Sequence, residues 1–256
     1  FGQFIMLPTT LLLIKHTGWS SALVISAILV ALCVPLAWML KAPMYVDPHA
    51  KPMSNAPSMS FKQILKIAFS HKPFLFLALG FLVCGFQVVF LGIHLPGYLI
   101  DHGFDASNGT IFLALVGLFN IIGTYTAGYL GDKYSKPHLL MWLYGLRGIA
   151  IIAFLSLPLS LWSIYSFGII MGLLWLSTVP LTNGIVANMF GVKYLTMLSG
   201  IVFFTHQIGS FFGGWLGGLN HDLTGNYNLM WMGAIGLSLF GVVVHFFVNE
   251  KVVVHD

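Results

Sequence analysis

The chain has 256 residues, of which 58% are hydrophobic and 7% are charged, and its formal net charge is +4. This composition, with a mean hydropathy of +0.91, carries more apolar surface than one soluble core can bury, which excludes a water-soluble enzyme or binding domain. The lysines flank apolar segments and form no basic aromatic face, so nucleic acid is not an expected partner. The composition predicts an all-α, polytopic transmembrane helix bundle in a lipid bilayer.

The apolar segments of the chain predict about eight spans. A helix needs roughly 20 mainly apolar residues to cross ~30 Å of hydrocarbon. In chain order the segments are 1–14, 22–40, 74–98, 109–130, 139–157, 161–187, 198–219 and 229–248. The first segment is short, and Phe1 is neither a start methionine nor the head of a signal peptide. We therefore expect the chain to be the later part of a longer protein.

Residues 41–72 are rich in proline and lysine and predict a polar linker between residues 1–40 and a six-span unit at 73–256. Near the end of this linker, Lys62 and Lys66 alternate with Phe61, Ile64 and Leu65. One interpretation is a short amphipathic helix on the inner membrane surface. The alternative is a basic flank that only fixes the topology.

The charges in the loops predict the orientation of the chain. Lysines fall on one side of the membrane, within 41–72 and at Lys133, Lys136, Lys193 and Lys251, whereas Asp101, Asp105 and Asp222 fall on the other side, with Lys15 as the exception. Because positive residues stay in the cytoplasm, we expect a cytoplasmic C-terminus.

A polar loop between the spans at 109–130 and 139–157 has the pattern G-x-x-x-D-K-x-x-K, formed by Gly128, Asp132, Lys133 and Lys136. Together with the two-span, linker, six-span order, this loop resembles the major facilitator superfamily. The resemblance implies twelve helices in two six-helix halves, with substrate bound between the halves near the midplane. Residues 1–40 would be helices 5 and 6, a remnant of the N-terminal half, and 73–256 would be helices 7 to 12. Helices 1 to 4 would be missing.

The resemblance assigns this loop the role of a conformational latch. We expect Gly128 to allow close packing against a neighbouring helix and Asp132 to face the positive N-terminal end of another helix. The resemblance implies that Asp132 meets the inner end of helix 5, which is cut at Phe1 in this sequence. Lys133 and Lys136 would reach headgroups or loop carboxylates. Ser135 stands where the family usually has glycine. The alternative is a polar loop with this spacing by chance.

Two further segments are similar to the monocarboxylate-porter-like bacterial branch of the family. They are Gly2-Gln3 with Pro8 ahead of Gly18-Trp19, and residues 188–210. This resemblance implies transport of a small organic anion together with protons across the inner membrane. Known monocarboxylate porters have a binding arginine on helix 8, but residues 109–130 contain none.

Arg147 is the only charged residue well inside a span of the six-span unit, which makes it a functional candidate. Its planar fork could bind a substrate carboxylate, or it could tie its helix to backbone carbonyls or to Asp132. The resemblance places helix 9 on the outside of the bundle, which favours the structural role.

Other polar side chains at mid-span depth complete the candidate substrate site: Gln87, His94, Asn120, Asn183 and His206. Gln87, His94 and Tyr98 share one stripe of a helix, which faces either a cavity or another helix. His94 and His206 could carry a proton. Asn183 follows Pro180, which frees a backbone carbonyl and predicts a gating bend.

The histidines never occur at metal-binding spacings, and the chain has no nucleotide-binding loop and no serine-nucleophile motif. We therefore expect no metal, no cofactor and no enzymatic activity. The prediction is a secondary active transporter of a small organic solute, with a monocarboxylate-like anion and protons as partners. The alternatives are an exporter of drug-like or metabolite compounds and a non-transporting membrane sensor or assembly protein.

Overall fold

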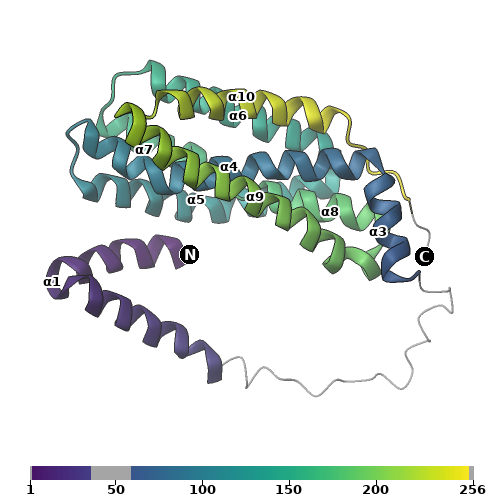
Figure 1. Ribbon diagram of the computed structural model, residues 1–256, viewed down its shortest axis with the longest axis horizontal. Coiled ribbons are helices and arrows are strands. Elements are labelled where there is room, and N and C mark those ends of the chain that lie inside the picture. Colours follow the sequence, from purple (N-terminus) through teal and green to yellow (C-terminus); the bar gives the residue numbers. More distant parts are fainter. Residues whose placement is uncertain (1, 36–58, 254–256) are drawn as a thin grey trace.

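The computed structural model describes residues 2–35 and 59–253, so the end of the predicted span at 36–40 and the linker at 41–58 lie outside the described residues. Within the described ranges the chain forms helices and no strands (Figure 1). The helices are α1 (Gly2–Ala31), α3 (Phe61–Ser70), α4 (Lys72–Asp101), α5 (Ala106–Lys133), α6 (Lys136–Ser156), α7 (Leu161–Leu174), α8 (Thr178–Phe190), α9 (Val192–Thr224) and α10 (Asn228–Phe246). The predicted all-α fold is confirmed.

Seven helical segments of the described residues are long and apolar enough to cross a membrane. The first of them, Gly2–Pro35, is bent at Gly18, where φ is 80°, so that α1 forms a hairpin of two apolar arms. Helices α7 and α8 together make one segment, Leu161–Phe190. Counting the two arms of α1, the segments match the predicted number of about eight spans.

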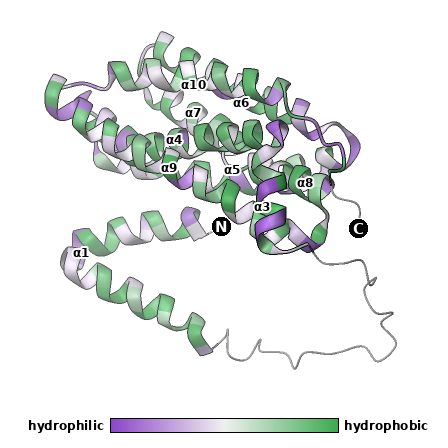
Figure 2. Cartoon of the chain, turned by 45° about the vertical axis from the view of Figure 1, so that its right-hand side comes forward, coloured by the Kyte–Doolittle hydropathy of each residue, from purple (hydrophilic) through white to green (hydrophobic). Residues whose placement is uncertain are grey.

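The helices α4 to α10 form one bundle, and α1 lies beside it and packs against α5 (Figure 1). A Cβ atom at Gly117 of α5 would come within 2.9 Å of both Gln3 and Phe4 of α1, which shows how closely the two helices approach. Figure 2 shows apolar residues along the helices and hydrophilic residues gathered at α3 and at the bundle ends. Apolar side chains therefore cover the surface that would contact lipid.

Helix α4 lies in the middle of the bundle and crosses α9 at very short range. A Cβ atom at Gly209 would lie 1.9 Å from the Leu82 carbonyl oxygen, and one at Gly213 would lie 2.4 Å from that of Phe86. On the α4 side, a Cβ at Gly85 would lie 1.9 Å from the His206 carbonyl oxygen. Small residues of this kind let two backbones touch, which increases packing between helices in lipid.

The predicted span at 161–187 is interrupted. Helix α7 ends at Leu174 and α8 begins at Thr178, so Trp175, Leu176 and Ser177 form a break. Pro180 has no N–H to donate to the carbonyl four residues earlier, and its ring clashes with that carbonyl, so proline kinks or breaks a helix anywhere beyond the first turn. It is the third residue of α8, so the bend predicted near Pro180 is present as a break just before it.

We expect Gly209→Ala to destabilise the bundle, because the added methyl group must push α4 and α9 apart. Overpacking of this kind costs about 1–3 kcal/mol. The matched control is Gly200→Ala in the same helix, where a Cβ meets no atom within 4 Å. Thermal unfolding in detergent, followed by size-exclusion chromatography, measures both. Equal midpoints for the two variants would contradict the crossing.

Candidate functional site

The side chain of Arg147 on α6 is completely buried, at 0% exposure, and it binds the break between α7 and α8. Its Nε donates to the Leu174 carbonyl at 3.2 Å, and Nη2 donates to the same carbonyl at 2.6 Å and to that of Trp175. Its Nη1 donates to Cys84 Sγ and to Gln87 Oε1, each at 3.4 Å. These partners occupy all the donor groups of the guanidinium.

The position of Arg147 follows from the break itself. The last carbonyls of a helix have no partner within that helix, and they carry the negative end of its dipole. The guanidinium places its positive charge at this end of α7. No carboxylate shares the site: among the described residues the ion pairs are Lys136–Glu250 and His221–Asp101. Backbone carbonyls therefore compensate the buried charge, as the structural interpretation of Arg147 expects.

Asn120 of α5 binds the other side of the break. Its Oδ1 accepts the Leu176 N–H at 3.0 Å and the Thr124 hydroxyl at 3.2 Å. Close by, Gly123 brings α5 against the end of α7, where a Cβ would lie 2.0 Å from the Leu173 carbonyl oxygen. The backbone groups that the break leaves without a helical partner are thus bound by side chains of two helices. Asn120 of α5 accepts the N–H group, and Arg147 of α6 donates to the carbonyls.

Gln87 of α4 extends this polar group to α10. Its Nε2 donates to the Ala234 carbonyl at 3.0 Å and to Ser238 Oγ at 2.6 Å, while its Oε1 accepts from Arg147. We call Gln87, Asn120 and Arg147, with the backbone of residues 174–176, the break network. Buried polar groups that satisfy one another in this way stabilise a single arrangement of the helices.

His94 of α4 is buried against α9. Its Nε2 lies 2.8 Å from the Gly214 carbonyl oxygen, and its ring fills the space at Gly217, where a Cβ would come within 2.3 Å of the ring. The ring also lies 5.5 Å from that of Tyr227. In this arrangement the polar stripe of α4 contacts neighbouring helices.

His206 lies in the middle of α9 and is only partly buried. Its ring centroid is 4.9 Å from that of Phe81, and its Nδ1 is 3.4 Å from Ser210 Oγ. His206 therefore contacts α4 through Phe81 while part of its ring stays exposed.

Asn183 of α8 and Ser199 of α9 each have a buried side-chain oxygen with no hydrogen-bond partner among the described residues. Both residues remain partly exposed. Buried polar atoms are nearly always paired, so these two oxygens have hydrogen-bonding capacity that the described residues do not use.

The loop with the superfamily pattern is anchored through Lys136. Its backbone N–H and its Nζ bind the two carboxylate oxygens of Glu250, at 3.0 and 3.3 Å. Asn188 at the end of α8 donates to the same carboxylate at 2.8 Å, and the Val253 N–H donates to the Met189 carbonyl at 2.7 Å. The segment after α10 thus ties the start of α6 to the end of α8. Lys136 reaches a carboxylate, as expected.

Among the other members of this loop, one prediction is wrong and two stay predictions. The close approach predicted at Gly128 is wrong for the described residues, because a Cβ there meets no atom within 4 Å; the close contact occurs at Gly131, against Leu181. Asp132 is exposed and has no hydrogen bond or ion pair within the described part of the chain. Helix α1 contacts α5 at Gly117, about four turns along α5 from Asp132. Lys133 binds the Tyr129 hydroxyl of its own helix.

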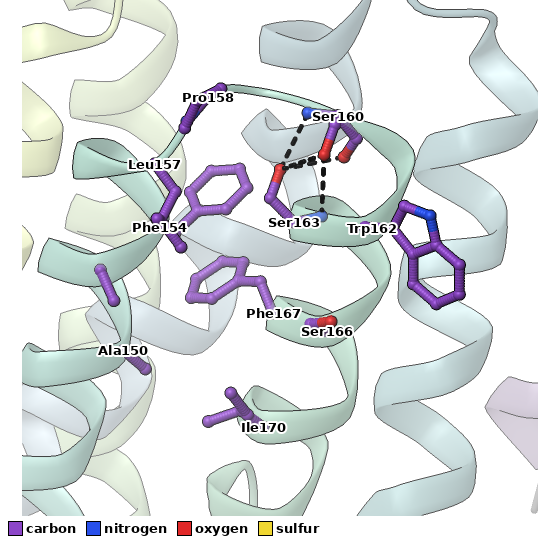
Figure 3. Close-up of a pocket in the computed structure, with 11 residues that line it drawn as sticks. Ala150, Phe154, Leu157, Pro158, Ser160, Trp162, Ser163, Ser166, Phe167 and Ile170 are labelled. Carbon is purple, nitrogen blue, oxygen red and sulfur yellow. Dashed lines mark hydrogen bonds between the residues drawn. The ribbon is translucent and has the colours of Figure 1, made fainter.

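A cavity of about 400 Å³ lies between the C-terminal end of α6 and the start of α7 (Figure 3). Its wall is almost wholly apolar, with Phe154 and Phe167 at its floor and the 85% exposed Trp162 at its rim. None of the predicted site residues lines it. With no charged side chain in its lining, this cavity offers no positive charge to an anion.

Sequence reasoning missed several members of the polar groups: Cys84, Ser238 and Glu250. Glu250 carried a usable signal, since a lone acid directly after the last span faces the lysines of the same membrane side. Cys84 and Ser238 had none, because a small side chain in an apolar helix usually packs without a further role. The described residues also hold no cluster of metal-binding side chains.

Comparison with known proteins decides the family, because residues 1–214 match the family model described as Major Facilitator Superfamily. The chain belongs to this superfamily. Similar proteins include the uncharacterized MFS-type transporter YcxA of Bacillus subtilis, which is 28% identical over 92% of this chain and 59% of its own length. Monocarboxylate transporter 12-B of Danio rerio is 26% identical over 88% of this chain and 53% of its own length.

Monocarboxylate transporter 13 of Bos taurus is 26% identical over 96% of this chain and 58% of its own length. The resemblance to the monocarboxylate-porter-like branch of the superfamily is therefore confirmed. The chain spans less than two thirds of the length of each of these relatives. It is a multi-pass membrane protein with relatives that are named as transporters.

We expect Arg147→Lys to destabilise the protein strongly even though it keeps the charge. A single ammonium group cannot reach two carbonyls, a thiol and an amide together. Each buried group left unpaired costs about 1–3 kcal/mol. Thermal unfolding in detergent tests this, with the exposed Lys133→Gln as control. A variant as stable as the control would show that the break does not need the guanidinium.

We expect Glu250→Ala to lower the unfolding temperature modestly, since it releases Lys136 and Asn188 together. The pair is partly exposed, so the expected loss is about 1 kcal/mol. The neighbouring Lys251→Ala is a matched control, because no contact of its side chain is present among the described residues. Identical midpoints for the two variants would contradict the anchoring role.

Proposed function

We propose that this chain is part of a secondary active transporter that moves a small monocarboxylate-like anion together with a proton by alternating access. Membership of the superfamily and the names of the relatives support transport of this class. The single observation that favours a particular site is the partly exposed His206 at mid-span. Arg147, the only charged residue well inside a span of the six-span unit, already uses all its donors on protein groups.

His206 can couple transport of the anion to transport of the proton, because both would bind the same imidazole ring. Imidazole exchanges a proton near neutral pH, and the protonated ring attracts a carboxylate by a charge-assisted hydrogen bond. Loss of the proton on the other side of the membrane would release the anion. Ser199, two turns earlier on the same face of α9, and Asn183 of α8 offer unpaired oxygens for the remaining polar groups of a substrate.

The break between α7 and α8 is the proposed joint of this half of the transporter. Two or three residues outside a helix can change their φ and ψ angles, whereas the hydrogen bonds of a continuous helix hold these angles fixed. Arg147, Asn120 and Gln87 are then positioning residues that hold the joint in one of its states, without touching the substrate.

The orientation and the domain division are also proposals. The lysine-bearing ends of α4, α5, α6 and α9 would face the cytoplasm of a bacterial cell, within its inner membrane, and the C-terminus would lie on that side. The packing of α1 on α5 supports 1–40 as the remnant of a partner half, with 41–72 as the linker and 73–256 as the six-helix half. The Gly128 to Lys136 loop would act as the conformational latch between the halves.

We expect His206→Ala, in the natural gene product that contains this chain, to reduce proton-driven uptake of labelled lactate in proteoliposomes by about ten-fold or more. Loss of one hydrogen bond to a charged group costs about 1.5–3 kcal/mol. The exposed His138→Ala is the control. Uptake that does not respond to an imposed pH gradient would contradict proton coupling, and competition by neutral compounds or cations would favour an exporter of such molecules.

A further inference from the structure

Helix α3 has a geometry unlike that of the other helices. It runs across the end of the bundle, crosswise to the spanning helices (Figure 1). A capping box fixes its start, where Ser60 and Gln63 exchange hydrogen bonds. Its start is tied to α9 as well, because the Met59 N–H donates to the Tyr194 hydroxyl at 3.1 Å. A helix held across the ends of membrane spans lies parallel to the membrane surface.

The residues of α3 divide into three stripes. Ile64 and Ala68, one turn apart, are buried against the bundle at 1% and 0% exposure. Beside them lies an aromatic stripe, in which Phe61 is 63% exposed and Phe69 is 54% exposed. Four-residue spacing puts Lys62 and Lys66 on the next stripe, where both are exposed. We call Phe61, Phe69, Lys62 and Lys66, with the adjacent Lys72, the α3 surface.

No acid among residues 2–35 and 59–253 pairs with the lysines of the α3 surface. Helix α3 contains no acid, and no ion pair of the described residues involves Lys62, Lys66 or Lys72. Lys193, also exposed, adds a further positive charge at the start of α9, next to Tyr194. Large exposed aromatic side chains next to lysines are typical of helices at a membrane surface, where the acyl chains are apolar and the headgroup layer above them carries negative charge.

We infer that the α3 surface binds anionic phospholipid, with the phenyl rings among the upper acyl segments and the lysines on the phosphate groups. Charge favours lipid over a protein partner, because loops on the lysine-bearing side of a membrane protein are themselves usually basic and would repel these lysines. Each lysine near an anionic membrane surface strengthens such binding about five-fold. This inference does not depend on the proposed transport activity.

The test places a fluorophore on α3 of the natural gene product in nanodiscs. Phe69→Cys is labelled with bimane in a Cys33→Ser background, since Cys33 is exposed and Cys84 is buried. Labels at Leu239, exposed in the middle of α10, and at Asp105, exposed in a loop, calibrate the lipid and water limits. Quenching by brominated phosphatidylcholine and phosphatidylglycerol is compared with quenching by aqueous iodide.

We expect the label at residue 69 to be quenched by brominated lipid, and more strongly as the phosphatidylglycerol fraction rises to about one third. Lys62→Gln with Lys66→Gln and Lys72→Gln should remove this dependence, whereas Lys133→Gln at the same end of the bundle should keep it. Quenching by iodide alone would overturn the inference. Quenching by neither agent would show that protein covers α3, and would overturn it as well.

Discussion

One buried positive charge organises the middle of this protein. A guanidinium inside a membrane domain must be compensated, and here the compensation comes from helix-end carbonyls. Those carbonyls are free only because the span is broken before Pro180. The arginine and the break therefore support each other: without the break the guanidinium loses its carbonyl acceptors, and without the guanidinium the carbonyls of Leu174 and Trp175 lose their donor in a dry environment. Helices α4, α5 and α10 are drawn into the same arrangement through Gln87 and Asn120.

The sequence predicted those features of the structure that follow from a lipid environment. Lipid demands long apolar helices, so their number, order and approximate ends could be read from hydropathy alone. Arg147 stood out for the same reason, as a charge where charge is costly. Its partners could not be predicted, since every residue has a carbonyl and only the fold decides which ones are free. At Gly128 the sequence pattern predicted a contact that is not present. Gly128 belongs to the superfamily pattern but has no close neighbour, whereas Gly131, which is not one of the defining residues of the pattern, packs against Leu181.

In the superfamily, both halves of a transporter contribute to the substrate-binding site. The relatives of this chain are nearly twice as long, and in the superfamily a cavity forms between two halves. The unpaired oxygens of Asn183 and Ser199 and the partly exposed His206 are the features expected of one wall of such a cavity. Anion selectivity would then arise from a titratable ring on α9, which differs from an arginine on helix 8 and links charge selection directly to proton exchange.

The carboxylate of Glu250 has a practical consequence for anyone who handles this protein. It lies beyond the last membrane helix, yet it holds the start of α6 and the end of α8. A fluorescent reporter or affinity tag joined directly after Val248 would delete this carboxylate, and a bulky fusion close behind it would strain the contact. Fusions placed after α10 therefore have to keep Glu250 and the residues up to Val253, because truncation before them would remove contacts that belong to the fold.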